Sequence, residues 1–155
     1  MKDKLQMALE YATKKHDGQF RKEGIPYISH PIAVAEYVRD WGYDESYQIA
    51  ALFHDLLEDT DATETEIEDI GGKEVLQTVK LLTKKESYVM SDYVNAIKKN
   101  QMAMVVKTAD RLHNLRSAVH TDNTFKRRYI AESKIWYADF SPEIEKAIEE
   151  LSTTL

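Results

Sequence analysis

The chain has 155 residues, of which 43% are hydrophobic and 31% charged, with a net charge of −6 and no cysteine. This length and composition predict one globular domain, residues 1–155, with a substantial core. The lack of cysteine excludes disulfides and thiolate metal sites, and the negative charge argues against general nucleic-acid binding. No run approaches about 18 apolar residues, so we expect no membrane span.

Only five glycines and three prolines interrupt the sequence, which predicts an all-α fold. The amino terminus leads into an amphipathic helix and not into an apolar signal core, and together with the lack of cysteine this is compatible with a cytoplasmic location. Apolar spacing predicts helices, in chain order, over about 4–16, 31–41, 45–57, a short helix ending near 71, 73–82, 92–100, 102–118, 123–138 and from 142 onward.

Several polar residues mark the expected helix starts. Thr63 and Glu66 have the spacing of a capping box. Asn123 or Thr124 is predicted to cap the next-to-last helix, and Ser141, followed by a proline, the last one.

One apolar helical run, residues 50–60, contains four ionisable side chains. His54 and Glu58 are four residues apart, as are Asp55 and Asp59, so each pair is expected to project from one face of a helix. Burying such groups is costly unless something compensates them, and a divalent metal would do so. The alternative is a helix end where the charges are simply solvated.

Two further segments accompany this run: residues 16–31, which contain His30-Pro31, and residues 105–116, with the sequence VVKTADRLHNLR. Together the three segments closely resemble the HD-domain hydrolases of the RelA/SpoT type, and most of all the small stand-alone alarmone hydrolases. The resemblance covers about residues 5–137. It implies a single HD-domain helical bundle and a metal-dependent hydrolase.

Four residues stand where the resembled family has its metal ligands: His30, His54, Asp55 and Asp110. Two imidazoles and two carboxylates without thiolate suit Mn²⁺, Fe²⁺ or Zn²⁺. The resemblance implies Mn²⁺. Taken singly, His30 could be a helix-entry residue and Asp110 an ordinary ion-pair partner.

The catalytic residues implied by the resemblance are Glu58 and Asp59. They lie one helical turn after the expected metal ligands His54 and Asp55. Two carboxylates can share the proton transfers of a hydrolysis if their environments separate their pKa values. The alternative is that they only terminate the helix.

Substrate-binding roles fall to Arg21, Lys22 and Asn114, which match the family's nucleotide pocket. A guanidinium can stack on a purine and an ammonium can contact phosphate. Either Tyr129 or Tyr137 is expected to supply the tyrosine of that pocket. Among the remaining histidines, His16 is expected to organise its loop, and His113 and His120 receive no role.

The function implied is removal of the 3′-pyrophosphate from guanosine tetra- or pentaphosphate, with a small-molecule nucleotide as partner and neither nucleic acid nor membrane. The exact nucleotide stays open, because the segment 83–92 lacks a clear match to the family's basic loop. Alternatives are another nucleotide (a dNTP, NADPH or an adenosine alarmone) and a weakly catalytic regulator or antitoxin. Assembly into a homo-oligomer is also left open.

Overall fold

The computed structural model describes residues 2–155, and within them there is no β-strand, only an isolated antiparallel bridge between Phe20 and Pro26. The predicted all-α fold is confirmed. The helices are α1 (Lys4–Lys15), α2 (Ser29–Asp40), α3 (Glu45–Phe53), α4 (Leu56–Asp59), α5 (Glu64–Gly71), α6 (Lys73–Leu82), α7 (Met90–Lys98), α8 (Gln101–Ser117), α9 (Asn123–Trp136) and α10 (Pro142–Ser152), with 3₁₀ turns η1 (Ala118–His120) and η2 (Ala138–Phe140).

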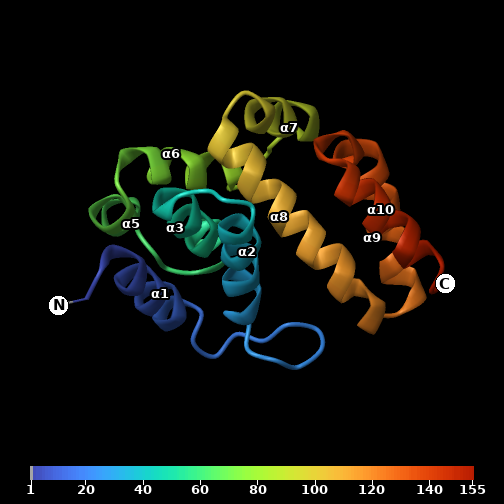
Figure 1. Cartoon of the computed structure of the whole chain (residues 1–155), viewed down its shortest axis with the longest axis horizontal. Coiled ribbons are helices and arrows are strands. Elements are labelled where there is room, and N and C mark those ends of the chain that lie inside the picture. Colours follow the sequence, from blue (N-terminus) through green and yellow to red (C-terminus); the bar gives the residue numbers. More distant parts are fainter. Residues whose placement is uncertain (1) are drawn as a thin grey trace.

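Helix α8 runs through the middle of the molecule (Figure 1). The pair α2 and α3 packs against one side of it, and α10, with α9 beside it, packs against the other. Helices α1, α5 and α6 extend the side of α3, and α7 packs on α8 near its start. The middle of α8 is therefore enclosed, so the polar side chains there need partners inside the protein.

Side-chain caps account for most helix starts. The predicted capping box is present, with Thr63 and Glu66 bonding each other's backbone N–H groups, and Ser141 caps α10 as expected. The predicted cap of α9 was wrong. Asp122 takes that place, because its carboxylate accepts the Phe125 N–H at 2.7 Å and its charge suits a helix N-terminus.

The helix predicted over residues 45–57 is broken in the structure. Helix α3 ends at Phe53, Asp55 leaves helical geometry with φ −115° and ψ 8°, and α4 begins at Leu56. The apolar pattern continues across the break, so periodicity did not reveal it. At the break, the His54 ring bonds the Ala51 carbonyl at the end of α3, and the Asp55 carboxylate accepts the hydroxyl of Tyr27 from another part of the protein, which together override the local helical preference.

The core is continuous through both sides of α8. The C-terminal half of helix α3 is apolar all round and is at most 3% exposed from Ile49 to Phe53. Helix α8 buries charged residues as well, and Arg111 illustrates how they are accommodated. Its guanidinium carbon lies 4.4 Å from the centre of the Tyr129 ring and 4.2 Å from that of Tyr137, and it donates to Glu132 at 2.8 Å. No helix within residues 2–155 is long and apolar enough to cross a membrane.

Candidate functional site

Three separate elements supply the predicted metal ligands. His30 lies in the first turn of α2, His54 and Asp55 occupy the break between α3 and α4, and Asp110 lies in the middle of α8. At the break, the His54 ring donates from Nδ1 to the Ala51 carbonyl at 2.7 Å. That bond orients the ring so that Nε2 of His54 is directed at α8.

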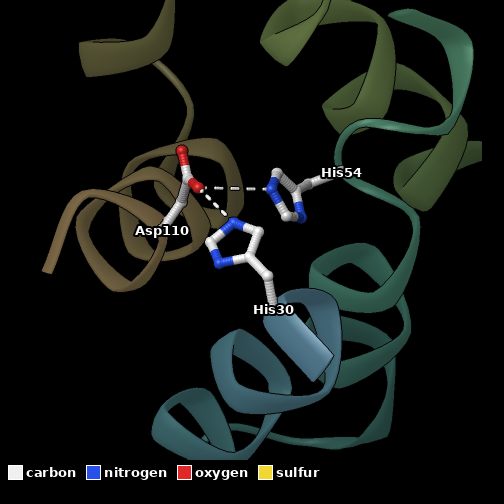
Figure 2. Close-up of side chains that lie close together, drawn as sticks. All are labelled: His30, His54 and Asp110. Atoms are coloured by element: carbon white, nitrogen blue, oxygen red, sulfur yellow. Dashed lines mark hydrogen bonds and ion pairs between the residues drawn. The ribbon is translucent and has the colours of Figure 1, made fainter. Parts of the chain in front are cut away.

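His30, His54 and Asp110 form one buried cluster, shown in Figure 2. Nε2 of His30 lies 2.8 Å from Oδ1 of Asp110, and Nε2 of His54 lies 3.3 Å from the same oxygen. One ligand atom from each residue lies within 4.8 Å of the others. Three of the four predicted ligands are thus brought together.

Asp55 lies beside this cluster and not in it. Its Oδ2 accepts the hydroxyl of Tyr27 and is 3.7 Å from Nε2 of His54. Its Oδ1 lies 3.3 Å from Nε2 of His16. The expected loop role of His16 is confirmed by a 2.9 Å contact of its Nδ1 with Gln19, whereas Asp55 as fourth metal ligand stays a prediction.

The charges of the site favour a bound cation. Burial raises the pKa of Asp110, but Lys107 and His54 outweigh burial and hold that pKa well below its ordinary value. Burial lowers the pKa of His54, and the carboxylates of Asp55 and Asp110 overcome this and raise it to about 9. Burial also raises the pKa of Asp55, but His54, His16 and Tyr27 outweigh burial and lower it. Both carboxylates are therefore ionised at neutral pH and attract positive charge.

The donor set fits a divalent ion with nitrogen and oxygen ligands. Two imidazole nitrogens converge with one carboxylate oxygen, and no thiolate is available. The buried Oδ1 of Asp55 makes no well-aligned hydrogen bond among the described residues and has Nε2 of His16 as its neighbour at 3.3 Å. The described residues thus provide a set of donors that could hold a divalent metal ion.

Next to the cluster is a cavity of about 160 Å³. It is lined by both predicted catalytic carboxylates, Glu58 and Asp59, and by Lys84 and Lys107. Oε1 of Glu58 accepts the backbone N–H of Lys84 at 2.5 Å. Burial, followed by the charges of Asp55 and Glu58, raises the pKa of Asp59.

All three predicted substrate-binding residues line a second cavity of about 260 Å³. The Arg21 guanidinium donates to Oδ1 of Asn114 at 3.1 Å, and Asn114 in turn donates to Asp110 at 3.2 Å. Nζ of Lys22 lies 3.5 Å from the centre of the Phe125 ring. Asn114 also lines the smaller cavity, so the two cavities adjoin at this residue.

The sequence left two tyrosines as candidates for this pocket, and the structure separates them. Tyr129 lines the second cavity. Tyr137 is completely buried, and its ring packs against Arg111. A groove of about 640 Å³ lies elsewhere, along the N-terminal half of α8, and contains none of the predicted site residues.

Sequence reasoning assigned no role to several residues of the site. Lys107 is buried in α8 and donates to Oδ2 of Asp110 at 3.2 Å, and Lys84 reaches the small cavity from the loop after α6. Phe125 comes from α9, far along the chain. Two of them carried a weak sequence signal: Lys84 belongs to a short cationic pair, and a lysine three residues before an aspartate, as Lys107 is, shares its helix face.

Comparison with known proteins gives a consistent result. Residues 8–141 match the family described as the HD domain. A probable guanosine-3′,5′-bis(diphosphate) 3′-pyrophosphohydrolase from Synechocystis is 37% identical over 83% of this chain, and a GTP pyrophosphokinase from Myxococcus xanthus is 31% identical over 97%. These matches cover 18% and 22% of the two relatives, so the chain spans about a fifth of their length.

A solved structure agrees over nearly the whole length of both chains. It is that of a metazoan ortholog of SpoT described as hydrolyzing ppGpp, and it superimposes with a TM-score of 0.81 at 26% identity. The alignment covers 97% of this chain and 94% of the other. With the buried histidine–aspartate cluster and the family match over residues 8–141, the chain belongs to the HD-domain family.

Proposed function

We propose that this chain is a metal-dependent pyrophosphohydrolase that removes the 3′-pyrophosphate from guanosine tetra- or pentaphosphate. The products are GDP or GTP and pyrophosphate. One observation carries the proposal: the buried cluster of His30, His54 and Asp110 lies beside a cavity with two carboxylates, which adjoins a pocket lined by cationic and aromatic side chains. The names of the relatives support the same reaction.

Mn²⁺ is the metal proposed, with Fe²⁺ or Zn²⁺ as alternatives of similar ligand preference. His30, His54 and Asp110 would hold it, and Asp55 would be the fourth ligand. When bound, such an ion supplies Lewis-acid polarisation of a phosphoryl oxygen and of the attacking water.

Glu58 and Asp59 are proposed to transfer the protons. Water attacks the phosphorus that is joined to the ribose 3′-oxygen, and the bond between that phosphorus and oxygen breaks. One carboxylate takes a proton from the water, and the other gives a proton to the departing 3′-oxygen. The raised pKa of Asp59 favours it as the acid, while the Lys84 N–H holds Glu58 in place as the base.

Arg21, Lys22 and Asn114 are proposed to bind the nucleoside and its 5′-phosphates in the second cavity. Phe125 and Tyr129 offer aromatic faces for stacking a base in the same cavity. Lys84 and Lys107 line the small cavity, where cations would neutralise the pyrophosphate that is removed. A cytoplasmic location and assembly into a homo-oligomer stay predictions.

The test is a panel of nucleotides incubated with the purified protein and Mn²⁺, with the products identified by mass. We expect GDP and pyrophosphate from guanosine tetraphosphate. If a dNTP, NADPH or an adenosine alarmone were hydrolysed faster, that nucleotide would replace guanosine tetraphosphate as the proposed substrate. Binding without turnover on the whole panel would favour a regulator or antitoxin.

A further inference from the structure

His113 follows Asp110 by three residues on α8, and the function proposed above assigns it no role. Its ring meets that of His30 edge to edge, with ring centres 5.0 Å apart and planes inclined by 25°. The Nδ1 atoms of the two rings are 2.7 Å apart, within hydrogen-bonding distance. This contact links His30, a member of the histidine–aspartate cluster, to the side of α8 that faces α2.

The contact restricts where the protons of the two rings can lie. Two N–H groups cannot face each other at this distance, so one Nδ1 donates and the other accepts. His30 has its Nε2 directed into the cluster with Asp110 and His54. A metal ligand must present a free electron pair, so a His30 that binds an ion through Nε2 carries its proton on Nδ1. His113 must then accept that proton through its own Nδ1.

The other nitrogen of His113 is also accounted for. With Nδ1 accepting, the proton of a neutral His113 lies on Nε2, which is 3.4 Å from the hydroxyl oxygen of Ser117. That hydroxyl accepts it, and the Tyr37 ring packs against His113 with ring centres 6.2 Å apart. A chain of hydrogen bonds thus runs from His30 through His113 to Ser117, with each donor matched by one acceptor.

His54 provides a parallel within the same site. Its Nδ1 donates to the Ala51 carbonyl, which leaves Nε2 facing Asp110. Metal-binding histidines generally donate their second ring N–H to an acceptor, which fixes both the proton and the ring orientation. Among residues 2–155, Nδ1 of His30 has no backbone carbonyl as a partner and meets the imidazole of His113 instead.

We propose that His113 is a positioning residue that accepts the Nδ1–H of His30 and thereby holds Nε2 of His30 toward the metal. The proposal rests on the metal site of the proposed function. It concerns metal affinity and the location of one proton, and it gives His113 no contact with substrate.

The first experiment locates the proton directly. The protein is loaded with Zn²⁺, a diamagnetic probe, and long-range ¹⁵N–¹H spectra of the histidine rings are recorded. We expect His30 to carry its proton on Nδ1, His113 to carry its proton on Nε2, and a coupling between the two Nδ1 nitrogens across the hydrogen bond. A proton on Nδ1 of His113 in the loaded protein would overturn the proposal.

The second experiment measures the Kd of Mn²⁺ in two variants of His113. Leucine has no acceptor and keeps water out, so His113→Leu should bind about 10- to 100-fold more weakly. In His113→Asn the amide oxygen takes nearly the place of Nδ1 and can accept the same proton, so we expect most of the affinity to return. Thermal melts in EDTA report any change in folding separately.

The matched control is His120→Asn, because His120 is exposed in η1 and outside the site. If wild-type protein binds no Mn²⁺, the metal site of the proposed function fails first. If wild-type protein binds Mn²⁺ and His113→Leu binds it equally well, only the role of His113 is refuted. Equal weakening in the Leu and Asn variants would likewise refute it, because the asparagine retains the acceptor.

Discussion

Replacing Glu58 by glutamine separates the charge of this side chain from its hydrogen bond. Oε1 of Glu58 accepts the backbone N–H of Lys84 at 2.5 Å, and the amide oxygen of glutamine can accept the same bond. The folded state keeps the contact, so we expect the free energy of unfolding to change by less than about 1 kcal/mol. Mn²⁺ binding should persist, because Glu58 is not a proposed ligand.

Turnover should respond very differently. An amide cannot take a proton from water, and losing one acid–base function lowers kcat by about 10²–10⁴. At about 1.36 kcal/mol for each factor of ten, this raises the barrier by about 2.7–5.4 kcal/mol. KM should change much less, because the lost interaction belongs mainly to the transition state. Asp59→Asn is expected to behave in the same way.

The assay follows release of pyrophosphate from guanosine tetraphosphate at saturating Mn²⁺, with kcat and KM determined for each variant. Glu145→Gln is the matched control, because Glu145 is exposed on α10 and lies outside both cavities. Wild-type kcat in both Glu58→Gln and Asp59→Asn would refute the proton-transfer mechanism and leave the metal site intact. A large drop in melting temperature would instead indicate that the carboxylates serve folding.

Three further predictions concern the metal, the nucleotide and the packing. Mn²⁺ at about 100 times its Kd should stabilise the protein by about 2.7 kcal/mol and raise Tm by about 5–11 °C over protein in EDTA; an unchanged Tm would contradict metal binding. Arg21→Ala and Lys22→Ala should each raise KM about 10- to 100-fold with unchanged Mn²⁺ affinity. An unchanged KM would show that neither side chain binds the nucleotide. Gly71→Ala should cost about 1–3 kcal/mol in urea unfolding, because its Cβ would lie 2.7 Å from Cγ1 of Val75; wild-type stability would show that this contact relaxes freely.

Much of the site could be predicted from the sequence because its residues occur in short sequence motifs. His54 and Asp55 stand out as charges within an apolar run, and Asp110 follows a similar run in α8. The break between α3 and α4 could not be predicted from the sequence, because the apolar periodicity continues across it. Long-range contacts decide that break: Tyr27, from a loop distant in the sequence, donates to the Asp55 carboxylate.

The sequence by itself determined the helical class and most helix boundaries, and its resemblance to a known family predicted three residues that the structure brings together: His30, His54 and Asp110. The helices follow from capping and apolar spacing, which are local properties of the chain, whereas the grouping of the site residues follows from the resemblance of three segments to a known family. Only the tertiary structure decided that Asp55 lies beside the cluster, that Tyr129 and not Tyr137 lines the pocket, and that His113 meets His30. These depend on how α2, α8 and α9 pack against one another, and packing joins residues more than 80 positions apart, such as His30 and His113, whose contact no local pattern records.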